Sequence, residues 1–201
     1  MFEDFFNNLV SSVSDIAAQT QQNLVLLLSV LGLLFSIYII NYFLKGRLFY
    51  LGLVPRKLKG IPGIVFSPFL HANFNHVFFN SIPLFVLLDF VCIFSPDHWL
   101  LITITITLMS GFLTWLFASK GTHVGASGVI TGYWGYLVFN IYAQTSIMSI
   151  ILGAISLYYF AGIFLGIFPK ERGVSWEGHL FGLMAGILAA WQINLLVQYF
   201  N

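Results

Sequence analysis

Apolar runs separated by short polar stretches dominate the chain. Six of these runs approach or exceed the roughly 20 residues that a helix needs to cross the hydrocarbon core of a bilayer. They cover about residues 16–44, 72–94, 99–118, 129–143, 147–168 and 178–197. The pattern predicts six transmembrane helices, with both chain ends on the same side of the membrane.

The residues before the first run follow another pattern. Apolar side chains recur there at helical spacing, with acidic and amide residues between them; they are Phe2, Phe5, Phe6, Leu9, Val10 and Val13. This spacing predicts an amphipathic helix on the membrane surface. We therefore expect a surface segment, residues 1–21, and a single transmembrane domain, residues 22–201. The acidic start and the long first apolar run argue against a cleaved signal peptide.

The loop between the first two runs is irregular. Five basic residues lie between positions 45 and 59, where glycines and a proline interrupt any regular element. Residues 61–70 are apolar again and contain Pro62, Gly63 and Pro68. We expect this second part to dip into the membrane or to pack on the bundle.

One run has a strand-like pattern. Isoleucine and threonine alternate from residue 102 to residue 107. An open strand edge cannot lie in lipid, and the run is long enough to span, so we expect a helix there. The predicted fold class is an all-α, polytopic membrane bundle.

Composition supports this class and excludes others. The chain is 59% hydrophobic and 7% charged, whereas soluble domains are about 25% charged. A formal net charge of +1 gives no basic field for nucleic acid. The single cysteine, Cys92, lies in an apolar run, which excludes a disulfide framework or a cysteine-based zinc site; we interpret it as a packed thiol. Nothing indicates a metal or an organic cofactor.

The first candidate for chemistry is the stretch Gly125-Ala126-Ser127-Gly128, which opens the fourth run behind a polar segment. A hydroxyl flanked by glycines is uncrowded, and the start of a helix carries the positive end of its dipole. Ser127 is therefore a candidate nucleophile.

A second group of polar residues lies at the start of the second span. It contains His71, His76 and Asn80, and the last two, four residues apart, share a helix face. Imidazole and amide groups are costly to bury in lipid without partners, so we expect them to face the bundle interior or water. Each alone could instead be an interhelical hydrogen bond.

The third candidate is His179, at the head of the last span. Small residues line one face of this span and one face of the fourth; they are Gly178, Gly182, Ala185, Gly186 and Ala189, and Gly128, Gly132 and Gly135. Small faces let helix backbones approach closely in lipid. If the two faces meet, Ser127 and His179 come within hydrogen-bond reach, and the imidazole can activate the hydroxyl. The alternative is helix packing with an incidental histidine.

No carboxylate completes a triad in this pattern. We interpret the candidates as interfacial or solvated charges; they are Asp89, Asp97, Glu171 and Glu177. Glu177 is turned by about 200° from His179 on a helix. The sequence thus predicts a Ser127-His179 dyad, with His76, Asn80 and the Ser127 amide stabilising an oxyanion.

Taken together in this order, the three motifs resemble the rhomboid family of intramembrane serine proteases, over about residues 22–198. The resemblance implies a six-span rhomboid bundle that cleaves transmembrane protein substrates. It also implies that Ser127 is the nucleophile, that His179 is the base and that His76 and Asn80 are oxyanion donors. In further roles, Gly125 and Gly128 would shape the site, Gly182 and Gly186 would pack the last helix on the fourth, and His71, near the mouth, would be structural or water-holding.

Two positions depart from the family pattern. Many relatives have a tyrosine four residues after the nucleophile, stacked on the histidine, where this chain has Thr131. Trp134, almost in register with Ser127, is a candidate to orient His179 instead. The Trp-Arg pair of the first loop is absent, and Pro62-Gly63 lies near its place.

The resemblance also implies a location. Bacterial six-span members lie in the inner membrane with the site opening to the extracytoplasmic face. Here every basic residue falls on the site's side, which the positive-inside rule would place in the cytoplasm. We expect the family orientation, because a loop packed into the bilayer edge need not follow that rule.

Two other functions stay open. The chain could be a catalytically silent rhomboid relative that binds membrane clients, although the intact serine, histidine and asparagine set argues against this. It could be a small transporter whose histidines relay protons. The clustering of its polar residues towards one face, rather than across the bilayer, argues against the transporter.

Overall fold

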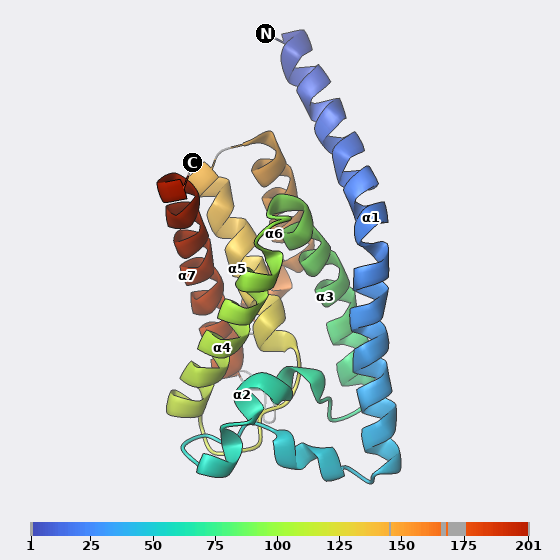
Figure 1. Cartoon of the computed structure of the whole chain (residues 1–201), viewed down its shortest axis with the longest axis vertical. Helices are drawn as coiled ribbons and strands as arrows, with labels where there is room; N and C mark the ends of the chain where they lie inside the picture. Colours follow the sequence, from blue (N-terminus) through green and yellow to red (C-terminus); the bar gives the residue numbers. More distant parts are fainter. Residues whose placement is uncertain (1, 145, 166–167, 169–175, 201) are drawn as a thin grey trace.

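The structure, a computed structural model, describes residues 2–144, 146–165, 168 and 176–200. This part of the chain is an all-α membrane bundle, as predicted (Figure 1). Its α-helices are α1 (Phe2–Phe43), α2 (Gly63–Phe66), α3 (Phe74–Phe94), α4 (Trp99–Phe117), α5 (Ser127–Gln144), α6 (Ile147–Leu165) and α7 (Trp176–Phe200). Three short 3-10 helices complete the first loop: η1 (Arg47–Leu51), η2 (Leu58–Gly60) and η3 (Ser67–Phe69).

Four of the described helices are long and apolar enough to cross a membrane, namely α1, α3, α4 and α7. The central helix, α5, is less apolar because it carries glycine, asparagine and aromatic residues, but it packs against α3, α4, α6 and α7. A helix surrounded by other helices exposes little surface to lipid, so fewer of its side chains need to be apolar. Its position explains why it can carry more polar residues than its neighbours.

Helix α1 is continuous over 42 residues, so no break separates residues 2–21 from the first span. At 1.5 Å per residue it is roughly 60 Å long, about twice the thickness of the hydrocarbon core. Its N-terminal turns project past the rest of the bundle (Figure 1). Part of α1 must therefore lie outside the hydrocarbon, and the surface position of its first turns stays a prediction.

The strand-like stretch of residues 102–107 is helical, as predicted, and lies within α4. Ile102 and Ile106, one turn apart, are fully buried on the same face. The Thr103 hydroxyl donates to the Trp99 carbonyl at 2.7 Å and lies 2.8 Å from the Tyr133 hydroxyl of α5. The threonine is thus satisfied inside the helix and across its interface.

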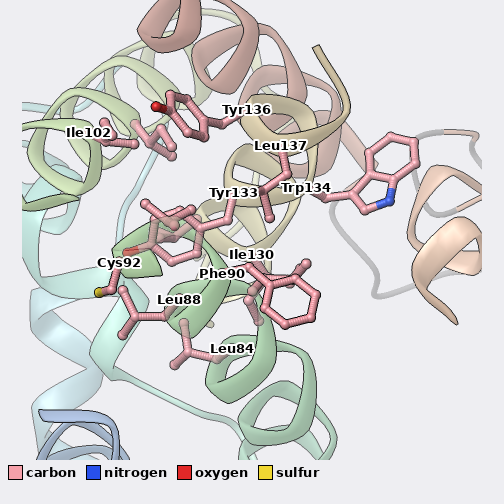
Figure 2. Close-up of a cluster of buried hydrophobic side chains, with 14 of the residues drawn as sticks. Leu84, Leu88, Phe90, Cys92, Ile102, Ile130, Tyr133, Trp134, Tyr136 and Leu137 are labelled. Atoms are coloured by element: carbon pink, nitrogen blue, oxygen red, sulfur yellow. The ribbon is translucent and has the colours of Figure 1, made fainter. Parts of the chain in front are cut away.

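The core is centred on α3 and α5, with contributions from α1, α4, α6 and α7. Figure 2 shows Tyr133 reaching from α5 towards Leu88 and Cys92 of α3, whereas Trp134 points away towards α6. The Cys92 thiol is free and buried, which confirms that it is a packed side chain. Tyr136, also buried, pairs its hydroxyl with that of Ser95 at 2.7 Å.

Two acidic residues differ from the prediction that they are interfacial or solvated. Asp89 is only 4% exposed, because Thr20 and Asn23 of α1 donate to its two carboxylate oxygens at 2.6 and 2.9 Å. Glu177 is 7% exposed and accepts the Ser119 amide proton at 3.0 Å. Partners supplied by distant segments made burial possible. Asp97 is exposed, as expected, and Glu171 lies outside the described residues.

The first loop packs on the bundle, one of the two arrangements expected for it. Leu53 and His123 form an antiparallel bridge, with N–H to O=C distances of 3.1 and 2.8 Å. A methyl group added at Gly111 of α4 would lie 2.8 Å from the Ile64 carbonyl oxygen of α2. The loop is therefore held both to α4 and to the segment that precedes α5.

Helices α5 and α7 meet along their small faces, as the glycine spacing predicts. A methyl group at Gly182 would overlap the Gly128 carbonyl oxygen, and one at Gly186 would overlap the Gly132 carbonyl oxygen. At Gly132 the added group would lie 3.1 Å from the Gly182 carbonyl oxygen. Only glycine at these positions allows the two backbones to approach so closely.

This contact predicts the effect of single methyl groups. Gly186→Ala should destabilise the fold by roughly 1–3 kcal/mol, because a backbone carbonyl cannot move aside as a side chain can. Gly32→Ala in α1 is the matched control, since nothing lies within 4 Å of its added methyl group. It should be neutral or gain up to about 1 kcal/mol from helix propensity. Thermal unfolding in detergent measures both, and an unfolding temperature of Gly186→Ala equal to that of Gly32→Ala would show the contact to be loose.

Candidate active site

The three candidate motifs converge at the end of the bundle where α5 and α7 begin. Ser127 is the first residue of α5 and is partly exposed. Thr131, one turn later, donates its hydroxyl proton to the Ser127 carbonyl oxygen at 2.7 Å. The residue that replaces the expected tyrosine therefore supports the backbone of the serine, a role that its spacing of four residues could have indicated.

His76 and Asn80 lie directly against the glycine two residues before Ser127. A methyl group at Gly125 would lie 2.6 Å from His76 Nε2 and 3.5 Å from Asn80 Nδ2. The φ angle of Gly125, +120°, is also one that other residues rarely adopt. Glycine is thus required here for both space and backbone conformation, and it lets the two polar side chains reach the start of α5.

Local capping sets the position of His76. Helix α3 begins at Phe74 because the Asn73 side chain accepts the His76 amide proton at 2.9 Å. His76 and Asn80 then follow on one face of α3. The sequence motif therefore contains its own helix start.

His71 is fully buried behind Asn80, rather than at an open mouth. It is 1% exposed, and its Nε2 lies 3.1 Å from Asn80 Nδ2 and 3.5 Å from the Ala126 amide nitrogen. Both of these nitrogens can only donate, so Nε2 is the acceptor and the imidazole proton is on Nδ1. His71 thus connects the oxyanion candidate Asn80 to the chain beside Ser127.

The environment of His71 keeps its ring neutral. Burial, together with the neighbouring His76 imidazole, lowers the pKa of His71 from 6.5 to about 4. The two rings meet edge to face, with their centroids 5.0 Å apart. Only the neutral ring offers an acceptor, so the bonds to Asn80 and Ala126 hold at neutral pH.

His179 occupies the first turn of α7 and is partly exposed. A methyl group at Gly128 would lie 3.2 Å from the carbonyl oxygen of Gly178, the residue before His179. The imidazoles of His179 and His76 are close enough for their charges to interact. The structure therefore brings the segments of Ser127, His179 and His76 together.

A small cavity opens beside this group. It has a volume of about 60 Å³ and is lined by Ser127, Gly125 and Gly178, by hydroxyl-bearing residues of α4 and, over most of its surface, by apolar groups; His76, Asn80 and His179 do not line it. The α4 residues are Thr107, Ser110 and Thr114. The hydroxyl-bearing residues offer polar partners, and the volume is enough for a few water molecules. Among the described residues, no set of histidine, cysteine or acidic side chains has the arrangement of a metal site.

Two residues have roles that the sequence did not reveal. Glu177 fixes the segment before α5 to the start of α7 through the Ser119 amide, so it contributes to positioning rather than to a triad. Trp134 donates its indole N–H to the Ser156 carbonyl oxygen of α6 at 3.1 Å. Its polar group therefore serves the α5–α6 contact, and a role in orienting His179 stays a prediction.

Comparison with known proteins agrees with this geometry. The sequence model described as Rhomboid domain matches residues 60–195. The chain is 34% identical over 178 residues to the uncharacterized protein Rv1337 of Mycobacterium tuberculosis, covering 84% of this chain and 74% of that protein. It is 31% identical over 180 residues to the uncharacterized protein ML1171 of Mycobacterium leprae, covering 85% of this chain and 71% of that protein.

The buried, neutral His71 predicts acid sensitivity. Its folded pKa of about 4 lies below the ordinary 6.5, so the unfolded chain takes up this proton first as the pH falls. The contribution of the neutral His71 ring to the free energy of unfolding is therefore complete above pH 6.5. It falls by roughly 3 kcal/mol in all as the pH approaches 4. His71→Gln, which cannot titrate, should lose less unfolding temperature between pH 7 and pH 4 than the parent or a His98→Gln control. An unchanged pH dependence in His71→Gln would contradict the assignment.

Proposed function

Since the chain belongs to the rhomboid family, we propose that it is an intramembrane serine endopeptidase that cleaves transmembrane or juxtamembrane segments of membrane proteins. The observation that carries the proposal is the meeting of three segments. Ser127 and His179 begin helices that touch through Gly128 and Gly178, and His76 and Asn80 lie against Gly125. These are the groups that acyl transfer to a serine requires.

In the proposed reaction, His179 takes the proton of the Ser127 hydroxyl as the oxygen attacks the carbonyl carbon of the scissile bond. The carbonyl becomes an oxyanion. When the C–N bond breaks, His179 gives the proton to the leaving amine, and an ester on Ser127 remains. Water then attacks this ester with His179 as base, which releases the new carboxyl end and restores the hydroxyl.

The oxyanion would receive hydrogen bonds from His76, from Asn80 and from the Ser127 amide. The Asn80 carboxamide has two protons, of which one is donated to His71. The other can point to the substrate, and the bond to His71 prevents the carboxamide from rotating its oxygen into that place. Donors held in advance are the main source of this kind of stabilisation.

Water and substrate would reach the serine from the same end of the bundle. The segment before α5 is exposed from Ser119 to Thr122, and the small cavity adjoins Ser127. A helix hides its carbonyl groups in its own hydrogen bonds, so the cleaved segment must unwind locally. Substrates should therefore carry small or helix-breaking residues near the cleavage point.

The dyad predicts two null variants. Ser127→Ala and His179→Ala should reduce cleavage of a model transmembrane substrate to background in proteoliposomes. Asn80→Ala should lose roughly 10²–10³-fold in rate, the usual effect of one oxyanion donor. The controls are Ser29→Ala, whose hydroxyl donates to the Val25 carbonyl oxygen of its own helix, and His98→Gln; both should cleave as the parent does.

A fluorophosphonate probe separates the proposal from its main alternative. It should label the parent and not Ser127→Ala. A folded parent that neither cleaves nor reacts would identify a silent, client-binding member of the family. Substantial cleavage by Ser127→Ala or His179→Ala would refute the dyad.

A further inference from the structure

The first loop carries a concentrated positive charge. Its five basic residues are all exposed; they are Lys45, Arg47, Arg56, Lys57 and Lys59. No acidic residue occurs anywhere between Asp15 and Asp89. The charge of this loop is therefore not balanced by acidic neighbours in sequence. The Arg56 guanidinium donates to the Leu116 carbonyl oxygen at 3.1 Å, and the exposed side chains of the other four basic residues can meet an external anion.

Apolar side chains are exposed on the same loop. Tyr50 is 72% exposed and Leu58 is 83% exposed. Leu58 stands between Lys57 and Lys59, and Tyr50 follows Arg47 by three residues. The two short helices that carry these residues, η1 and η2, pack against each other. Basic groups with neighbouring aromatic and aliphatic side chains fit the boundary between headgroups and hydrocarbon, because the apolar parts enter the lipid while the charges meet the headgroups.

The loop is rigidly attached to the candidate site. The Arg56 amide donates to the Trp115 carbonyl oxygen of α4 at 2.9 Å, and the Trp115 indole donates to the Lys57 carbonyl oxygen at 3.0 Å. Leu53 lies between the basic residues at positions 45–47 and those at positions 56–59. It pairs with His123, four residues before Ser127. The loop also lies at the end of the bundle where α5 begins (Figure 1). Anything that holds the loop also supports the segment that leads to the serine.

We propose that residues 45–59 form a docking surface for the headgroups of anionic phospholipids. A lipid surface fits better than a nucleic acid or an acidic peptide, because the loop directly follows the membrane-spanning part of α1 and a bilayer accommodates both the charges and the exposed Tyr50 and Leu58. Clusters of four to eight basic residues next to a transmembrane helix bind anionic lipids through such electrostatic attraction. Docking to lipid also explains why the basic residues lie on the same side as the site. In this explanation the charges bind headgroups and do not determine which side of the membrane the loop occupies.

The binding test uses the full chain in bilayers. Arg47→Gln, Lys57→Gln and Lys59→Gln are combined, while Lys45 and Arg56, which have positive φ angles, are kept. The matched control is Arg47→Lys, Lys57→Arg and Lys59→Arg, and a second control is Lys120→Gln, an exposed lysine outside the loop. The readout is tryptophan quenching by brominated phosphatidylglycerol against brominated phosphatidylcholine, because Trp115 adjoins Lys57.

The parent and both controls should prefer phosphatidylglycerol several-fold, and the glutamine variant should lose most of that preference. Raising the salt to about 0.5 M should weaken the preference of the parent by screening. An equal preference in the parent and the glutamine variant overturns the proposal, as does the absence of any preference in the parent.

A second readout rests on the proposed protease function. Cleavage in vesicles containing about one-third phosphatidylglycerol should exceed cleavage in pure phosphatidylcholine several-fold for the parent, but not for the glutamine variant. Lipid preference without any cleavage supports the docking surface and refutes the protease function. A preference for phosphatidylglycerol, together with a cleavage rate that does not depend on the lipid, supports the docking surface and refutes its coupling to Ser127.

Discussion

The arrangement of this protein depends on the contact between α5 and α7. Apolar surface gives no driving force between helices in lipid, so close packing and polar pairs must hold them together. Here the Gly128 and Gly132 carbonyl oxygens occupy the places that side chains at residues 182 and 186 would fill. That approach fixes the first turn of α7 beside the first turn of α5, and with it the relation of His179 to Ser127.

Polar bonds also hold α7 at both of its ends. At the site end, Glu177 of α7 accepts the amide proton of Ser119, in the segment between α4 and α5, at 3.0 Å. At the far end, Gln144 of α5 donates to Asn194 of α7 at 2.7 Å, and Asn194 donates to the buried Asn140 at 3.3 Å. Glycines permit the approach in the middle, and these directional bonds set the register. The site is therefore a consequence of packing along the whole length of the two helices.

Much of the fold follows from the sequence, because lipid demands helices and the apolar runs give their positions. The length of α1 does not follow, because the segment before the first run continues into the same helix. The glycine spacing also predicts which helix faces meet. The roles of buried polar groups do not follow, since distant segments supply their partners. Asp89 looks like an interfacial charge until Thr20 and Asn23 of α1 are placed beside it.

The candidate site shows the same division. Ser127, His76 and Asn80 stand out as residue types in a pattern, and the structure brings their segments together. The part played by His71 could not be predicted, because it depends on the Ala126 amide and the Asn80 side chain meeting one buried nitrogen. Thr131 was visible only as a departure from a family pattern, and its bond to the Ser127 carbonyl oxygen gives it a function of its own.

The most direct test of the account is the adduct of a 4-chloroisocoumarin, a reagent that acylates a serine and can then alkylate an imidazole within reach. Peptide mapping by mass spectrometry of the reacted protein reports which residues it joins. The account predicts one cross-link, between the peptide of Ser127 and the peptide of His179, which disappears in Gly186→Ala if that variant loosens the helix contact. Attachment to Ser127 without any link to His179, or attachment elsewhere, would contradict it.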